Sequence, residues 1–365
     1  MSIPSTIFAE EEKKSKEIEV KSSILMCMDT GDIISEENAY EHMSPASVTK
    51  IMSILLIMEA IDSGKISLDD MVAASENAVS KGGSQIWLEV GEQMSVNDLL
   101  KAVIISSAND ACTLLSEYVA GSASGFVDMM NAKVKELGLK DSNFENCTGL
   151  DDDVTNHYSC AYDLAVISSE VMKHKLVMKY TTIWLDSLRN GKTELNNTNK
   201  LINSFNGITG LKTGTTSNAG FCVSATAKRD GMHLVAVVLG SETSNDRFDA
   251  AAYLLDYGFA NYQIVKPEIN KKKIKEVAVS LGEEKTVKPV MKNSSKICIE
   301  KNNSEISYKY NIVEKVEAPV KKGASLGEIV VLADKKQIGK IELVSDKSIS
   351  RLTLKAVFMN IILKI

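Results

Sequence analysis

A serine and a lysine stand at the start of a long apolar run, in the stretch SPASVTKIMSILLIMEAI that contains Ser47 and Lys50. Residues i and i+3 share one face of a helix, so the two side chains would lie together. If the helix begins near Ser47, its hydroxyl lies among unpaired backbone N–H groups at the positive end of the helix dipole. Burial lowers the pKa of a lysine, and a neutral Lys50 would be a general base that activates the serine.

Two more polar clusters follow along the chain. They are ISSAND, with Ser107 and Asn109, and GLKTGTTS, with Lys212, Thr213, Gly214 and Thr215. A second cation at Lys212 would lower the Lys50 pKa further. A glycine such as Gly214 on a strand lets another backbone approach closely. The three clusters therefore predict one site for nucleophilic catalysis, provided that the fold brings them together.

The elements around these clusters predict an α+β domain. Residues 22–39 read as a β-hairpin and residues 47–62 as a helix that is apolar nearly all round, hence buried. A mostly helical region extends to about residue 190. After residue 208 strands return, and Asp230-Gly231 between two apolar runs is a hairpin signal. Strands from both ends with helices between them predict an antiparallel sheet beside a helical subdomain.

The residue pattern of the remaining chain differs from that of the first 262 residues. From about residue 265 a basic linker leads into short alternating runs, SKICIE, ISYKYNIV, GEIVVLAD and KQIGKIELV, which read as strands of a small all-β domain. The sequence thus predicts four parts, with the boundaries 1–20, 21–262, 263–345 and 346–365.

Both ends of the chain bear on location. Residues 1–20 begin with a short apolar scrap ending at Phe8-Ala9 and continue as a charged segment, which reads as the remnant of a secretory signal or as an ordinary N-terminus without fixed structure. At the other end, Lys347, Arg351 and Lys355 recur at helical spacing before an apolar stretch. We expect an amphipathic helix on a membrane surface, or else a final helix packed on its own domain. The expectation is an exported protein of the cell envelope.

Composition excludes other classes of function. The formal net charge of −6 argues against a nucleic-acid partner. None of the six cysteines forms a C-x-x-C pair, and the four histidines show no metal-binding array, so no metal or other cofactor is expected. We expect the cysteines to be buried free thiols without a chemical role. No apolar run is long enough to span a bilayer.

The three clusters resemble, in type and order, the S-x-x-K, S-x-N and K-T-G motifs of the penicillin-binding protein and serine β-lactamase superfamily. The stretches GGSQIWLEVGE, SSANDA, HYSCAYDLA, LNNTNKLI and LLDYGF are similar to the low-molecular-mass D-alanyl-D-alanine carboxypeptidases of peptidase family S11. The resemblance is close over about residues 20–262 and weaker beyond. It implies a penicillin-sensitive serine carboxypeptidase that removes the terminal D-alanine from peptidoglycan stem peptides.

The resemblance also implies a role for each motif residue. Ser47 would attack the carbonyl of the penultimate D-alanine, and Lys50 would take its proton. Ser107 would relay a proton to the leaving amine, and Asn109 would bind an amide of the peptide. The terminal carboxylate and the oxyanion would be bound by Lys212, Thr213, Gly214 and Thr215, together with the Ser47 N–H. Stem peptides and β-lactam antibiotics are the implied partners.

The sequence departs from the family at Cys160, where threonine is frequent, and at Cys147-Thr148, where a histidine often precedes the glycine. Three alternatives stay open. A β-lactamase would need a deacylating glutamate, but the run Glu194-Leu195-Asn196 is wrongly placed for this and reads as a strand. A sensor or scaffold would be acylated without turnover. An endopeptidase acting on cross-links would use the same chemistry.

Overall fold

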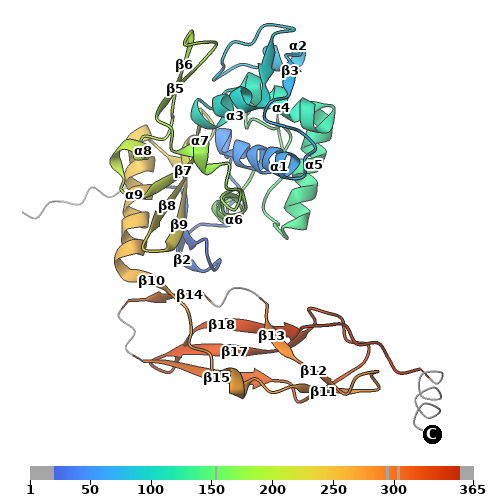
Figure 1. Cartoon of the computed structure of the whole chain (residues 1–365). Helices are drawn as coiled ribbons and strands as arrows, with labels where there is room; N and C mark the ends of the chain where they lie inside the picture. Colours follow the sequence, from blue (N-terminus) through green and yellow to red (C-terminus); the bar gives the residue numbers. More distant parts are fainter. Residues whose placement is uncertain (1–19, 153, 293–295, 302–304, 354–365) are drawn as a thin grey trace, which may run out of the picture. The chain divides into compact units, whose positions relative to one another are not determined.

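The computed structural model describes residues 20–152, 154–292, 296–301 and 305–353 (Figure 1). The chain divides into two compact units, each described here by itself. The first comprises Met1–Ile24, Ser35–Thr226 and Val235–Leu254, and the second comprises Leu25–Ile34, Ala227–Leu234 and Leu255–Ile365.

One five-stranded sheet has the order β2-β1-β9-β8-β7. Its strands are β1 (Ser22–Cys27), β2 (Ile33–Glu37), β7 (Ile208–Thr216), β8 (Gly220–Arg229) and β9 (Met232–Ser241). Strands β1 and β9 run antiparallel, because Lys21 N donates to Leu239 O while Met28 N donates to His233 O. The predicted hairpins at residues 22–39 and at Asp230-Gly231 are confirmed. Strands distant in sequence thus meet in the centre of the sheet.

The helices of the first unit come mainly from the middle of the chain. They are α1 (Lys50–Asp62), α2 (Glu76–Val79), α3 (Val96–Ile105), α4 (Asn109–Ala120), α5 (Ala123–Glu136), α6 (Ala161–Val171), α7 (Met178–Thr181) and α8 (Leu201–Ser204). Two small antiparallel two-stranded sheets accompany them, β3 (Met71–Ala73) with β4 (Gln93–Ser95) and the hairpin of β5 (Leu185–Leu188) with β6 (Thr193–Asn196). Helix α9 (Ser244–Asn261) is the last α-helix among the described residues.

Helix α1 is the buried centre of this unit, as its all-round apolar sequence predicts. It packs against α4, α5 and α6 (Figure 1), and its residues from Lys50 to Met58 are all buried. The α-helix begins at Lys50 rather than at Ser47, because residues Ala46–Thr49 form a 3₁₀ turn before it. Such turns are frequent at helix N-termini. The turn keeps Ser47 at the mouth of the helix and Lys50 inside.

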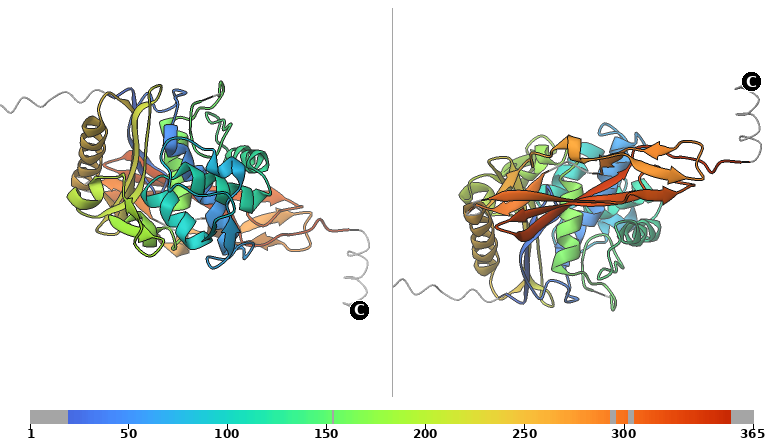
Figure 2. Two further views of the ribbon diagram at one scale, coloured as in Figure 1. Left: turned by 90° about the horizontal axis from the view of Figure 1, so that it is seen from above. Right: turned by 90° about the horizontal axis from the view of Figure 1, so that it is seen from below.

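The second unit contains the predicted short strands after residue 262. Its strands are β10 (Tyr262–Val265), β11 (Val277–Ser280), β12 (Thr286–Val287), β13 (Pro289–Met291), β14 (Ile297–Glu300), β15 (Ile306–Ile312), β16 (Lys315–Glu317), β17 (Ser325–Ala333) and β18 (Lys336–Ser345). They form the sheets β13-β18-β17-β15, β12-β11-β16 and β10-β14. The long hairpin of β17 and β18 is visible in Figure 2.

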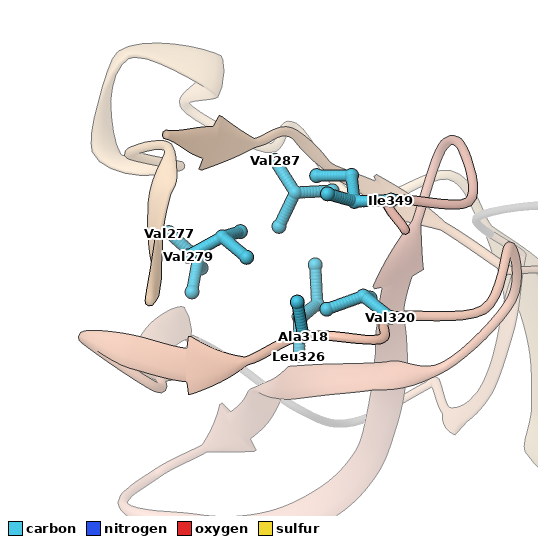
Figure 3. Packing of buried hydrophobic residues seen from close by; sticks show 7 residues of the cluster. All are labelled: Val277, Val279, Val287, Ala318, Val320, Leu326 and Ile349. Carbon is cyan, nitrogen blue, oxygen red and sulfur yellow. The ribbon is translucent and has the colours of Figure 1, made fainter. Parts of the chain in front are cut away.

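Two apolar clusters form the core of these sheets. One gathers side chains from β11, β12, the start of β17 and nearby loops, and Figure 3 shows its members Val277, Val279, Val287, Ala318, Val320, Leu326 and Ile349. The other lies on the sheet of β17 and β18 and includes Ile329, Val331 and Leu343. Strand β15 alternates between half-buried and exposed residues, as a strand with one covered face should.

The C-terminal segment departs from the expected helix. Ile349 forms an antiparallel bridge with Val320, and Arg351 forms one with Gly282. Lys347 is paired with Glu284, and its helical spacing from Arg351 therefore falls on extended chain. The helix prediction is wrong for this part because the alternating pattern around Ile349 completes a sheet core. Lys355 and the apolar stretch after it lie outside the described residues. Among the helices described, none combines the length and apolar character that crossing a bilayer requires.

Candidate active site

Ser47 and Lys50 are joined directly at the N-terminus of α1. Lys50 Nζ donates to Ser47 Oγ over 2.8 Å and to the backbone O of Thr148 over 2.8 Å. Lys50 is completely buried, whereas Ser47 is half-buried. Burial lowers the pKa of Lys50 to about 8. At a given pH the neutral fraction of this amine is far larger than that of an exposed lysine, which makes it a base for the hydroxyl beside it.

Hydrogen bonds to the loop at Cys147 fix the position of the Thr148 carbonyl that contacts Lys50. The backbone O of Cys147 accepts hydrogen bonds from Ser53 Oγ of α1 over 2.6 Å and from Cys112 Sγ of α4 over 3.3 Å. The loop is thereby fixed to two helices. Its next carbonyl, that of Thr148, is consequently aimed at Lys50 Nζ.

A buried histidine fixes the turn between the serine and the lysine. His157 Nδ1 accepts from Glu145 N, so in the neutral ring Nε2 carries the proton and donates to Thr49 Oγ1 over 2.9 Å. Burial lowers the His157 pKa to about 4, which keeps the ring neutral. The sequence reasoning missed this role, because a lone histidine gives no signal without its spatial neighbours.

Strand β7 brings the third cluster against the serine. A Cβ added to Gly214 would lie 2.9 Å from Ser47 N and 2.8 Å from Pro45 O, so only glycine fits here. Lys212 is buried and its Nζ donates to the backbone O of Thr213. Burial, then the charge of Lys50 and that of Arg247, hold the Lys212 pKa well below its ordinary value. The Ser47–Lys50 pair and the Lys212–Gly214 stretch thus form one site.

The second cluster lies at the turn between α3 and α4. Ser107 has a φ of 63°, and its buried Oγ has no hydrogen-bond partner within the described chain. Asn109 Nδ2 donates to Gly82 O over 2.7 Å, and Asn109 Oδ1 is buried without a partner in the same part of the structure. Strained backbone and unsatisfied polar atoms gather at functional sites. Helix α4, which begins at Asn109, packs on α1, which begins at Lys50.

Arg247 on α9 is a further member that the sequence did not indicate. Its Nη1 donates to Gly214 O over 2.9 Å, to Thr215 Oγ1 over 3.0 Å and to Cys222 O over 3.2 Å. The guanidinium lies over the rings of Phe221 and Phe248. Burial lowers the Arg247 pKa to about 10, so the group stays charged at neutral pH. Arg247 adds a fixed positive charge directly behind β7.

The departure at Cys160 has a structural explanation. All six cysteines are free and buried, as predicted. Cys160 caps α6, since its Sγ accepts from Asp163 N over 3.3 Å, which is the role of a hydroxyl at such a position. Asp163 also accepts from Ser142 Oγ and from Asp141 N. The Asp141 carboxylate instead contacts His42 Nε2 over 3.0 Å, and it lies near the side chains of Cys160 and Asp163.

The run Glu194-Leu195-Asn196 is a strand, as predicted. It lies in β6, where Glu194 is exposed and pairs with Ser187 of β5. A cavity of about 630 Å³ does adjoin the site, and its lining includes Gly82, Asn146 and Thr148. The acidic residues of the 145–154 loop that line this cavity are Glu145 and Asp152, and Glu194 is not part of the lining.

The family model for D-alanyl-D-alanine carboxypeptidase matches residues 8–243, and that for the C-terminal domain of penicillin-binding protein 5 matches residues 262–351. The chain belongs to the D-alanyl-D-alanine carboxypeptidase family. It is 38% identical over 338 residues to the D-alanyl-D-alanine carboxypeptidase DacF of Bacillus subtilis, which covers 91% of this chain and 86% of the relative.

Solved structures agree. Penicillin-binding protein 5 from Haemophilus influenzae superposes with a TM-score of 0.81 at 32% identity, covering 91% of this chain and 98% of that one. Penicillin-binding protein D2 from Listeria monocytogenes in its cefotaxime-bound form gives a TM-score of 0.60 at 30% identity, covering 66% and 97%. The α+β fold with a C-terminal all-β domain is confirmed. The protein is a serine-type D-Ala-D-Ala carboxypeptidase that acts in cell-wall metabolism.

Proposed function

We propose that Ser47 is the nucleophile and that Lys50 is its general base. The observation that carries this assignment is the 2.8 Å hydrogen bond between Lys50 Nζ and Ser47 Oγ, made by a completely buried amine. Ser47 Oγ attacks the carbonyl carbon of the penultimate D-alanine as its proton passes to Lys50. The resulting tetrahedral intermediate expels D-alanine and leaves an ester on Ser47, which water then hydrolyses.

The K-T-G strand and Arg247 would bind the charged end of the substrate. Lys212, Thr213 and Arg247 supply positive charge and a hydroxyl for the terminal carboxylate. The N–H groups of Ser47 and Thr215 stabilise the oxyanion as charge develops on it. The close approach of Gly214 to Ser47 N supports assigning these two N–H groups to one oxyanion.

The S-x-N cluster would serve the leaving group and the peptide. Ser107 passes the proton from Lys50 to the leaving amine, since its hydroxyl has no other partner among the described residues. Asn109 is held through Nδ2, which leaves Oδ1 free to accept from a substrate N–H. Peptidoglycan stem peptides ending in D-Ala-D-Ala are the substrates. A β-lactam would enter by the same attack and remain as an acyl group on Ser47.

Labelling and turnover together test this assignment. The wild type, Ser47→Ala and the control Ser44→Ala are incubated with a fluorescent penicillin, and D-alanine release from a free pentapeptide is measured in parallel. We expect the label on the peptide containing Ser47, with label and release both lost in Ser47→Ala alone. Label retained by Ser47→Ala would overturn the assignment. Labelling without D-alanine release indicates a sensor, and rapid turnover of a cephalosporin indicates a β-lactamase.

The location of the protein is also a proposal. An exported enzyme would meet its substrate in the envelope, and the segment from Lys355 onward, basic and then apolar, would make peripheral contact with the membrane. Truncation after Thr353 spares the buried Ile349 and should release the protein from anionic vesicles; unchanged binding would refute the anchor.

The boundaries proposed for the catalytic and all-β domains, 21–262 and 263–345, agree in outline with the two family matches.

A further inference from the structure

Trp87 is an exposed tryptophan in an unusual backbone conformation. Its side chain is 75% exposed, although its neighbours Ile86 and Leu88 are 2% and 4% exposed. Its φ is 58°, in the left-handed region that bulky residues rarely adopt. Such a conformation is energetically unfavourable and persists only where the surroundings impose it. The fold therefore directs this indole outward at a cost in stability.

A polar network imposes this conformation. Ile86 N and Leu88 N, on either side of Trp87, both donate to the carboxylate of the buried Asp110 at 3.1–3.2 Å. From the β5–β6 turn, Arg189 donates to Ile86 O over 2.8 Å and to Trp87 O over 3.3 Å. Arg189 is itself held by Glu92. The backbone on both sides of the tryptophan is satisfied, and only the indole projects freely.

The same loop is fixed to the substrate-binding asparagine. Asn109 precedes Asp110, and its N donates to Ser84 O while its Nδ2 donates to Gly82 O, both over 2.7 Å. The segment from Gly82 to Trp87 therefore runs from the peptide-binding side of the site to the surface. The loop that binds Asn109 is thus also the loop that carries the exposed Trp87.

We propose that Trp87 is a stacking platform for a sugar ring of the glycan chain that carries the stem peptide. The proposal rests on the proposed function, because it assumes that a stem peptide occupies the site. The indole offers a flat apolar face, and a pyranose ring offers an apolar C–H face. The polar residues Ser84, Gln85 and Glu89 lie close to Trp87 along the chain. Of the two charged residues of the 84–92 segment, Glu92 is paired with Arg189 and Glu89 is acidic, so the loop has no excess of positive charge for an anionic lipid surface.

Tryptophan fluorescence tests the contact between Trp87 and the sugar ring. The chain has two tryptophans, so in Trp184→Phe the emission comes from Trp87 alone. This variant is titrated with a disaccharide pentapeptide of N-acetylated amino sugars, with the free pentapeptide, and with phosphatidylglycerol vesicles. We expect a change in emission with the disaccharide pentapeptide and none with the other two. A shift with vesicles and not with the disaccharide would overturn the proposal in favour of a membrane contact.

Kinetics give a second readout that does not depend on the Trp184 variant. Trp87→Ala should raise KM for the disaccharide pentapeptide about fivefold to tenfold, since tenfold corresponds to about 1.4 kcal/mol. The KM for the free pentapeptide should change less than about twofold, and Trp87→Tyr should restore most of the difference. The control is Tyr253→Ala, another exposed aromatic residue, on α9. Equal losses on both substrates would overturn the sugar contact, whereas a wild type inactive on both would instead refute the proposed function.

Discussion

The chemistry of this enzyme depends on a lysine that loses its proton easily. Lys50 has no carboxylate among its hydrogen-bond partners in the described chain; it faces a hydroxyl and a carbonyl. Burial therefore outweighs the opposing effect of the nearby Cys112 and Cys147 thiols, and the folded-state pKa falls to about 8 from an ordinary value of 10.5. A depressed lysine pKa means that the neutral form gains as pH rises through the folded value.

The pH dependence of acylation follows from this shift. The second-order rate of labelling by a fluorescent penicillin should rise about tenfold per pH unit below about pH 8 and level off above it, because only neutral Lys50 accepts the Ser47 proton. Lys50→Arg should abolish labelling at every pH, since a guanidinium does not act as a base in this range. A rate that is flat between pH 6 and 8 would contradict the assignment.

Arg247 gives a second test at this scale. Arg247→Gln removes the charge beside Gly214 and Thr215, and we expect kcat/KM for pentapeptide to fall about tenfold to a hundredfold, as charge-assisted contacts to a carboxylate are lost. An amidated peptide without the terminal carboxylate should be affected much less. The matched control is Arg229→Gln, whose ion pair with Asp256 lies at the surface. A loss that is equal for both peptides would assign Arg247 a purely structural role.

At the scale of elements, local patterns predicted most of what the structure contains. The apolar stretch after Lys50 predicted a buried helix, and Asp230-Gly231 predicted a hairpin, because periodicity and turn chemistry are local properties. The three motifs located the site for the same reason. Arg247, Asp110 and His157 were missed because their roles come from neighbours far away in the sequence. The helix expected at Lys347 was wrong because tertiary packing of Ile349 overrides a helical spacing of charges.

Asp110 shows how one buried side chain ties elements together. It accepts from Ile86 N and Leu88 N, so Asp110→Ala leaves two amides of the 82–92 loop unpaired. We expect a loss of about 2–4 kcal/mol in the free energy of unfolding, measured by denaturant titration. Faster amide exchange at Ile86 and Leu88 should accompany the loss. Glu89→Ala, an exposed position in the same loop, serves as the control and should change stability by less than about 0.5 kcal/mol. Comparable stability of the two variants would contradict the tethering role.

At the scale of the whole molecule, the catalytic site and the all-β core draw on different residues. The site is built on α1, α4 and β7, whereas the cluster around Val279 and Ile349 is confined to the chain after residue 276. Each hydrophobic core therefore has its own complement of buried side chains. A defect introduced in one core should reach the other only to the extent that the two unfold together.

Ile349→Ala tests that separation. Ile349 is 2% exposed within the cluster shown in Figure 3, so truncation should cost about 2–5 kcal/mol in the stability of the all-β core. We expect calorimetry to show a lowered transition for this unit, while the rate of penicillin acylation at 20 °C stays within about twofold of wild type. Ser348→Ala is the neighbouring control; it removes only a bond from Lys322 N at the surface. If acylation slows in proportion to the loss of stability, the two cores fold as one cooperative unit and the separation argued from their composition is wrong.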